Sequence, residues 1–300
     1  MEVAIQLRAA YPEVLAAARW AEAEGLAAFA MPDHYLAGTD ASLPAYDHLL
    51  QFAGLARETT RIELVDLVSP VTFRHPAVYA KTAVTLAEMS DERFVLGLGT
   101  GWLEDEHRLF GLPFPEQATR FRMLEEALGY VKAFTVGEAF TGDYYQLEAF
   151  ESQPRPHFKI VVGGSGATRT PELAGRYADE LNLFPSDDGD LIGRVAVCHR
   201  AATDAHRDPA SVRLSYTTPV FAASHEPGYR KLIAAEAAER NRTPEALESR
   251  LTDRHIPFGW GEQLTERLTP VSDAGVSRIY LQVGTSDLSR IAQLVAPFRS

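Results

Sequence analysis

The chain alternates short apolar runs with longer stretches in which apolar residues recur every three or four positions. The short runs predict buried β-strands, and the longer stretches predict amphipathic helices. The predicted strands are Val3–Leu7, Ala27–Met31, Arg61–Val68, Arg93–Leu98, Lys159–Gly163, Asp179–Phe184, Val212–Phe221 and Arg278–Val283. The predicted helices are Tyr11–Glu24, Ala45–Thr59, Pro76–Met89, Arg120–Phe134, Ala167–Tyr177, Leu191–His206, Gln263–Ala274 and Leu288–Val295.

Eight strands, each followed by a helix, are the count of a TIM barrel, and this is the predicted fold class. An open, doubly wound sheet has the same local order of elements and stays an alternative. We predict one domain over residues 1–300, because no linker rich in proline, glycine or serine divides the chain. Three insertions interrupt the repeat, near residues 103–117, 137–157 and 224–257. The first is expected to be irregular and the last to contain helices of its own.

Composition narrows the functional class. The 300 residues are 46% hydrophobic, which is enough for a sizeable core, and carry a formal net charge of −12. A diffuse acidic excess argues against nucleic acid and against an anionic membrane as partners. The single cysteine, Cys198, excludes an intrachain disulfide, and no apolar run approaches the roughly 20 residues that span a bilayer. We therefore expect a cytoplasmic protein that binds no membrane.

A glycine-rich turn, Gly97–Trp102, follows the predicted strand Arg93–Leu98. Its pattern is GxGxG rather than GxGxxG, and it does not open directly into a helix, so a dinucleotide fingerprint is a weak interpretation. Glycines at the carboxyl end of a barrel strand instead allow a flat ligand to approach the backbone closely. Thr100 and Trp102 are then candidate walls of the site.

A second glycine cluster, Gly163-Gly164-Ser165-Gly166, lies between a predicted strand and a predicted helix. Backbone N–H groups in such a turn, with a helix N-terminus behind them, form an anion site, for which a phosphate is the natural ligand. A tight turn that needs positive φ angles is the alternative. Three glycines with a serine exceed what such a turn requires, which favours the phosphate.

Two acidic residues and a histidine are candidates for chemistry. Asp33 and His34 directly follow a predicted strand, so His34 is placed to exchange a proton in the mouth of the barrel. Asp33 could orient the His34 ring or pair with another group, and a polar capping pair is the alternative. Asp66 interrupts the apolar run Arg61–Val68, where a carboxylate either faces the site or hydrogen-bonds a buried backbone group or a nearby arginine. No metal-ligand spacing and no GxSxG elbow is found.

Taken together, these segments resemble the luciferase-like family of flavin and deazaflavin enzymes, which are TIM barrels with insertions. The resemblance covers nearly the whole chain and is greatest for the branch that uses coenzyme F420, a deazaflavin hydride carrier. The motifs that carry it are PDHYL (Pro32–Leu36), FRHPAVYAK (Phe73–Lys81), LAEMSDERFVLGLGTGW (Leu86–Trp102), HRLFGLPFP with RF and LEEAL (His107–Leu128), GDYYQL (Gly142–Leu147), PRP with IVVGGSG (Pro154–Gly166), AGRYADELN (Ala174–Asn182) and AGVSRIYLQV (Ala274–Val283).

The resemblance implies a role for each matching position. His34 would be the catalytic proton-transfer residue, and Asp66-Leu67 would form a cis peptide bond behind the deazaflavin ring. Thr100 and Gly101 would line the ring, and the second glycine cluster would hold the cofactor phosphate. The predicted cofactor-binding residues are Asp33, Asp66, Leu67, Thr100, Gly101, Gly163, Gly164, Ser165 and Gly166.

The substrate is predicted only by class. We expect hydride transfer between coenzyme F420 and a small organic molecule. Trp102 stands where sugar-phosphate dehydrogenases of this family carry a glutamate acid, which argues against glucose 6-phosphate. Trp102 and Tyr35 are the predicted substrate-pocket residues, with Phe73 and Trp260 as further aromatic candidates, Phe73 being better explained as core. An FMN-dependent monooxygenase or reductase and a non-catalytic flavin-binding barrel are the alternatives. A homodimer is possible.

Overall fold

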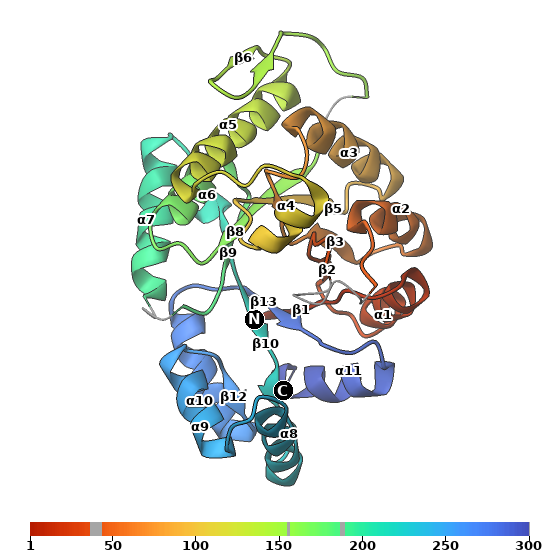
Figure 1. Ribbon diagram of the computed structural model, residues 1–300, viewed down its shortest axis with the longest axis vertical. Helices are drawn as coiled ribbons and strands as arrows, with labels where there is room; N and C mark the ends of the chain where they lie inside the picture. The colour runs from red at the N-terminus through yellow and green to blue at the C-terminus, as the bar shows by residue number, and fades with distance from the viewer. Residues whose placement is uncertain (37–43, 155–156, 187–189, 300) are drawn as a thin grey trace.

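Eight parallel strands form a closed barrel in the computed structural model, which describes residues 1–36, 44–154, 157–186 and 190–299 (Figure 1). The barrel strands are β1 (Glu2–Gln6), β2 (Ala28–Met31), β3 (Glu63–Asp66), β5 (Phe94–Gly99), β8 (Lys159–Gly164), β9 (Glu180–Leu183), β10 (Arg213–Pro219) and β13 (Arg278–Gln282). The barrel closes because β1 pairs with β13 and β3 pairs with β5. The predicted TIM barrel is confirmed, and the open sheet is excluded.

A ring of helices surrounds the strands in Figure 1. Their bounds are α1 (Tyr11–Ala23), α2 (His48–Glu58), α3 (Pro76–Met89), α5 (Gln117–Val136), α6 (Arg169–Tyr177), α7 (Leu191–Asp204), α10 (Gly261–Asp273) and α11 (Leu288–Val295). Local sequence explains several ends: Pro76 begins α3, where a missing N–H costs nothing, and Asp47 caps α2 by accepting from the N–H of Leu49.

Two hydrophobic layers follow from the alternation of side chains along each strand. Val65 and Leu67 point into the barrel, where they pack with small residues such as Ala4 and Ala30. Leu64 points the other way, into the larger core between strands and helices. Because Asp66 is two positions from Leu64, the same alternation turns the Asp66 side chain toward the helices.

The insertions decorate this frame. Residues 103–117, predicted to be irregular, contain the helix α4 (Glu104–Phe110), which lies across the front of the barrel in Figure 1. Residues 137–157, of which 155–156 lie outside the described residues, contain the hairpin strands β6 (Phe140–Thr141) and β7 (Gln146–Leu147). The remaining short elements are β4 (Ser69–Pro70), η1 (Pro209–Ser211), β11 (Phe221–Ala222), β12 (Phe258–Gly259) and η2 (Ala296–Phe298).

The last insertion contains α8 (Glu226–Glu239) and α9 (Pro244–Asp253), which confirms its predicted helices. Their apolar faces meet in a small cluster separate from the main core, with Tyr229 and Leu251 among its buried members. In the part of the chain that the structure describes, no helix combines the length and apolarity needed to cross a membrane.

Candidate active site

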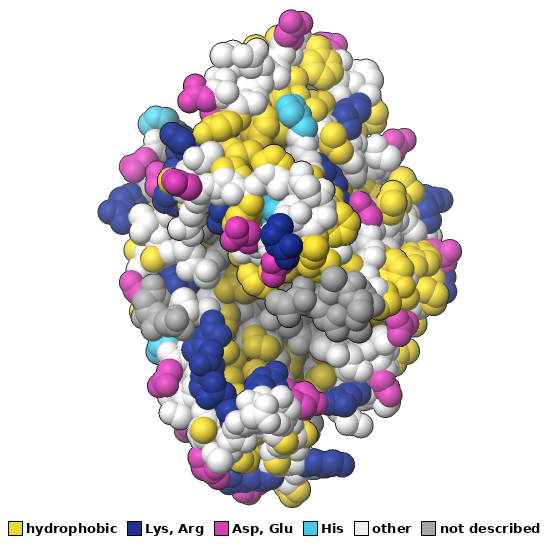
Figure 2. All heavy atoms as spheres, viewed as in Figure 1, with side chains coloured by type: hydrophobic (Ala, Val, Ile, Leu, Met, Phe, Trp, Pro, Cys, Tyr) yellow, Lys and Arg dark blue, Asp and Glu magenta, His cyan; other side chains and the backbone are white. Residues whose placement is uncertain are grey.

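A cavity of about 1250 Å³ opens at the carboxyl ends of the barrel strands. Segments that follow seven of the eight strands line it, and Arg254 at the end of α9 adds a contribution from the last insertion. Figure 2 shows the hollow at the centre of this face, with Lys or Arg side chains at its rim. Ligands of α/β barrels bind at this end of the strands.

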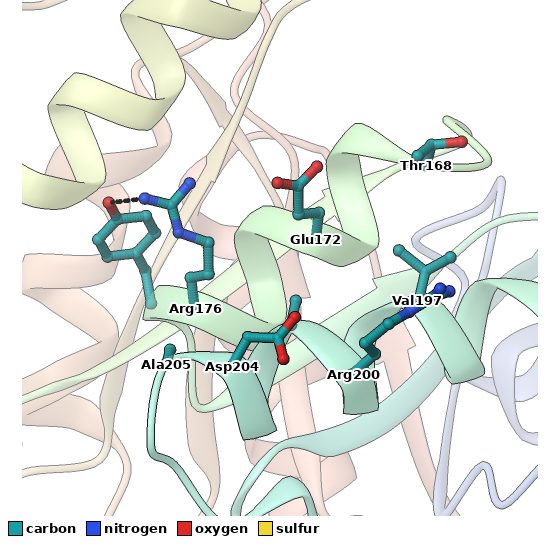
Figure 3. Close-up of a pocket in the computed structure, with 9 residues that line it drawn as sticks. Thr168, Glu172, Arg176, Val197, Arg200, Asp204 and Ala205 are labelled. Carbon is teal, nitrogen blue, oxygen red and sulfur yellow. Dashed lines mark hydrogen bonds between the residues drawn. The ribbon is translucent and has the colours of Figure 1, made fainter.

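A second, smaller cleft of about 680 Å³ lies on the outer wall, between α6 and α7 (Figure 3). Its charged side chains, Glu172, Arg176, Arg200 and Asp204, lie along the two helices, and Arg176 donates to the hydroxyl of Tyr177 at 2.9 Å. No histidine and no glycine-rich turn lines it. The chemistry predicted from the sequence therefore belongs to the barrel mouth.

His34 lines the cavity and is held by a buried carboxylate. Its Nδ1 lies 2.9 Å from Oε1 of Glu106, which is 1% exposed, whereas the His34 side chain is 19% exposed. The Leu36 N–H donates to the same oxygen at 3.0 Å. A carboxylate accepts hydrogen bonds, so Nδ1 carries the hydrogen and Nε2 is left to exchange a proton with a ligand.

Asp33 does not orient the His34 ring, contrary to the first of its two predicted roles. Its carboxylate, 1% exposed, accepts from Ser69 Oγ at 2.9 Å and from Arg74, and it lies 3.2 Å from Nδ1 of His48 without a well-aligned hydrogen bond. Burial alone would raise the pKa of Asp33, but the cations of His48 and Arg74 hold this pKa well below its usual range. Asp33 borders the cavity as part of an ion cluster beneath it.

The prediction that Asp66 contacts the cofactor is wrong. Asp66 is fully buried, does not line the cavity, and receives a hydrogen bond of 2.9 Å from Nε2 of His48. The physical reason is the strand alternation, which turns Asp66 toward α2 and Leu67 toward the barrel interior. Burial raises the pKa of Asp66, against the opposing charge of His48.

The cis peptide bond lies one residue beyond the predicted position, between Leu67 and Val68 rather than between Asp66 and Leu67. Both Leu67 and Val68 line the cavity. The Leu67 carbonyl accepts from Nε2 of Gln6 at 2.7 Å, and the Gln6 oxygen accepts from Nε2 of Gln282 at 2.8 Å. An amide chain from three barrel segments therefore fixes this backbone.

The glycines of the first turn serve two purposes. A Cβ at Gly97 would lie 1.7 Å from the backbone oxygen of Asp66, so this glycine admits protein backbone rather than the flat ligand expected from the sequence. Gly99, Thr100 and Gly101 line the cavity, and Gly101 has a φ of +73°. Within this turn, a ligand can thus approach the backbone closely only at its second half, from Gly99 to Gly101.

The second glycine cluster lines the cavity over its full length, from Gly163 to Gly166. None of its glycines has a positive φ, which excludes the tight-turn alternative. Space explains them instead, because a Cβ would lie 3.0 Å from Val68 at Gly163 and 2.9 Å from the Thr170 hydroxyl at Gly166. The adjoining helix α6 has no side-chain cap, and since Pro171 has no N–H and Glu172 donates to the Thr168 carbonyl, the N–H groups of Arg169 and Thr170 are those that an anion could use.

The aromatic candidates separate into two groups. Trp102 lines the cavity, is 70% exposed and meets the His34 ring edge-on at 5.8 Å between centroids. Tyr35, predicted in the substrate pocket, does not line the cavity and stacks on Phe73 with 4.3 Å between the ring centroids. Phe73 is core, and Trp260 packs on Tyr229 in the last insertion.

Several cavity residues escaped the sequence reasoning, and most share a signal. They stand within three residues after a barrel strand, the position that brought His34 to attention. Glu106 lies on α4, seven positions beyond the end of β5 at Gly99, and so has no such signal. Among the described residues, no group of three His, Cys, Asp or Glu side chains is arranged to hold a metal ion. The residues missed include Gln6, Arg8, Val68, Arg120, Phe184 and Val283.

The comparison with known families is decisive for ancestry. The family model described as luciferase-like monooxygenase matches residues 2–299. The chain belongs to the luciferase-like monooxygenase family. Within this family, the chain is similar to the F420-dependent glucose-6-phosphate dehydrogenase of Microbacterium testaceum, with 37% identity over 142 residues, 46% of this chain and 42% of that protein.

Two further relatives extend the comparison. The dehydrogenase of the same description from Intrasporangium calvum is 29% identical over 262 residues, 79% of this chain and 75% of that protein. An F420-dependent secondary alcohol dehydrogenase in complex with an F420–acetone adduct has the same fold, with a TM-score of 0.80 at 18% identity over 98% of this chain and 96% of that one. The chain spans less than half the length of four of the curated relatives, between 37% and 49%.

Proposed function

We propose that this member of the luciferase-like family is an oxidoreductase that transfers a hydride between coenzyme F420 and a small organic substrate. The observation that carries the proposal is His34, held by buried Glu106, with Nε2 left toward a cavity that a glycine cluster also lines. The relatives at 29% to 38% identity that carry the name of an F420-dependent enzyme support the choice of cofactor.

The cavity fits a flat ring that bears a phosphate. Its volume of about 1250 Å³ exceeds the roughly 300–1,000 Å³ of pockets for drug-sized ligands. A Cβ at Gly99 would lie 2.8 Å from the Val68 side chain, so a residue larger than glycine would crowd Val68 at this wall of the cavity. Leu67, Thr100 and Gly101 would hold the ring, and the backbone of Gly163–Gly166 would hold the phosphate.

The protein's own groups then position and move a proton. When bound, the deazaflavin supplies a ring carbon that takes or gives a hydride. The Nε2 atom of His34 supplies or removes the accompanying proton, while Glu106 fixes the tautomer and stabilises the imidazolium. The Trp102 indole lies edge-on to His34 and offers apolar contact to the substrate.

The substrate is proposed not to be a sugar phosphate. The position where the resemblance expects a glutamate acid holds Trp102, whose indole N–H can donate a hydrogen bond but cannot give up a proton as a carboxylic acid does. In the described cavity lining, the acids are Asp33 and Glu106, and both are buried and engaged. We expect no oxidation of glucose 6-phosphate by the purified protein in the presence of oxidised F420.

Titration of the purified protein distinguishes the proposal from its alternatives. Oxidised and reduced F420 and FMN are added separately, followed by visible absorbance and fluorescence. F420 binding without FMN binding supports the proposal, whereas tight FMN binding without F420 binding assigns the chain to the monooxygenase alternative.

The variant His34→Ala tests for catalysis. We expect F420 binding to be retained and F420-dependent turnover to fall by about 10²- to 10⁴-fold, the usual contribution of a positioned acid–base residue. The matched control is His157→Ala, because the His157 side chain is 76% exposed. Unchanged turnover in His34→Ala would mean that water can exchange the proton instead, and it would refute the role assigned to His34. Absence of turnover in the wild type with every substrate class tested would favour a non-catalytic barrel.

Homodimer formation and a cytoplasmic location stay predictions from the sequence. Size-exclusion chromatography with light scattering tests the first, and fractionation of cells that express the chain tests the second.

A further inference from the structure

Arginines from separate elements line the cavity, and the order of the strands around the barrel shows on which side of the cavity Arg8 lies. Arg8 follows β1, whose neighbour β2 is followed by His34, whereas the glycine cluster begins at the end of β8. Three strands separate β1 from β8 in either direction around the barrel, so Arg8 lies opposite the proposed phosphate site. Arg120 lies on the phosphate side, because Phe121 next to it is 3.7 Å from where a Cβ of Gly166 would be.

Arg8 is tied into the His34 assembly by one of its three guanidinium nitrogens. Its Nη1 donates to the Leu36 carbonyl at 2.6 Å, and the Leu36 N–H donates to Glu106, which holds His34. Within the described part of the chain, Nε and Nη2 of Arg8 have no hydrogen-bond acceptor. These two nitrogens form the side-on edge of the guanidinium, which matches the two oxygens of a carboxylate.

The surroundings of Arg8 favour a monoanion. Arg8 is half-buried at the cavity wall, and burial lowers its pKa against the opposing charge of Glu106. A desolvated cation gains from an anionic partner more than an exposed one does. Because Glu106 already supplies a negative charge beside Arg8, a phosphate dianion would be repelled there more strongly than a singly charged carboxylate.

We propose that Arg8 binds a carboxylate of the substrate and makes the enzyme selective for carboxylic acids whose reacting carbon lies beside His34. The inference rests on the proposed function, since it takes the His34 side of the cavity as the substrate side. Arg8 is then a specificity residue, separate from the residues that hold the cofactor.

The test compares ligands that differ only in charge. We choose 3-phenylpropanoate, its amide and phenyl phosphate, since the exposed Trp102 offers a surface for an aromatic ring. Binding is measured by calorimetry, with and without F420, for the wild type, Arg8→Gln, Arg8→Lys and Arg120→Gln. We expect the wild type to bind the carboxylate at least about tenfold more tightly than the amide, as charge-assisted bidentate hydrogen bonds imply.

In Arg8→Gln we expect this preference to disappear while the Kd for F420 is unchanged, and in Arg120→Gln we expect it to remain. Arg8→Lys retains the charge without the planar edge and should keep only part of the preference, which guards against a folding defect in the glutamine variant. An amide bound as tightly as the acid, a preferred phosphate, a preference that survives in Arg8→Gln, or F420 binding lost with Arg8 would each overturn the proposal. Absence of F420 binding in the wild type would instead refute the proposed function. The two failures can be told apart because the comparison of the acid with the amide measures binding alone and needs no turnover.

Discussion

Replacement of His48 by glutamine tests the ion cluster beneath the active site. His48 lies on the first turn of α2 with its side chain 2% exposed, and each ring nitrogen faces a carboxylate: Asp33 at 3.2 Å and Asp66 at 2.9 Å. A neutral imidazole has one N–H, so only the imidazolium can donate toward both. Glutamine can donate toward one carboxylate and would turn its own oxygen toward the other.

The magnitude follows from the pKa. Burial would lower the pKa of His48, but Asp33 and Asp66 outweigh burial and raise the pKa from 6.5 to about 10. At about 1.4 kcal/mol per pH unit, the difference between 6.5 and about 10 corresponds to about 5 kcal/mol. Loss of one partner of a buried ion pair typically costs about 3–5 kcal/mol, so we expect His48→Gln to lower the free energy of unfolding by about this amount at pH 6.

The sign of the pH dependence is fixed by the same shift. A raised folded-state pKa contributes stability that is fully present below pH 6.5 and is lost as the pH rises through about 10. Urea unfolding followed by circular dichroism from pH 6 to pH 10 should therefore show the gap between wild type and His48→Gln narrowing as the pH rises. The control His157→Gln, at an exposed position, should parallel the wild type. A gap that stays constant or widens would refute a cationic His48.

Three further substitutions have defined outcomes. Glu106→Gln keeps an acceptor for the His34 imidazole but removes its charge, so, if His34 acts as proposed, kcat should fall about 10- to 100-fold with F420 binding retained, measured by steady-state kinetics. Gly97→Ala should destabilise the fold by at least about 3 kcal/mol in urea unfolding, because its Cβ would meet the Asp66 backbone oxygen, whereas Gly111→Ala has open space and should cost about 1 kcal/mol. Gly166→Ala would press on a threonine hydroxyl and should weaken F420 binding but not binding of a phosphate-free deazaflavin, measured by fluorescence titration.

The barrel was predictable from the sequence because its strands are continuous apolar runs and its helices are long and amphipathic. The bounds of α3 and α11 agree with the prediction to the residue. The helix α4 was missed because EDEHRLF is short and mostly polar, so it has no apolar face to reveal it. Its stability depends on tertiary contact, in which Glu106 and His107 are the buried members.

The residues of the candidate site also differ in whether the sequence could predict them. Residues directly after strands, such as His34 and Gly163–Gly166, could be placed at the mouth from sequence position alone, and they line the cavity. The partner of His34 could not, because Glu106 is 72 positions away. The direction of the Asp66 side chain follows from the alternation of side chains along the strand, because Asp66 is two positions from Leu64 and so lies on the same face.

The seam between β1 and β13 has a consequence for how the molecule forms. Glu2 pairs with Arg278, 276 positions away in the chain, so the barrel cannot close until almost the whole chain has been made and collapsed. Before that moment both strands are open edges of a parallel sheet, able to pair with other chains. The Gln6 and Gln282 amides, which meet across this seam and brace the Leu67 carbonyl, join only on closure. A ligand that binds against the Leu67 backbone would bind only the closed barrel. By mass action it would therefore favour the closed barrel over the open forms that can aggregate.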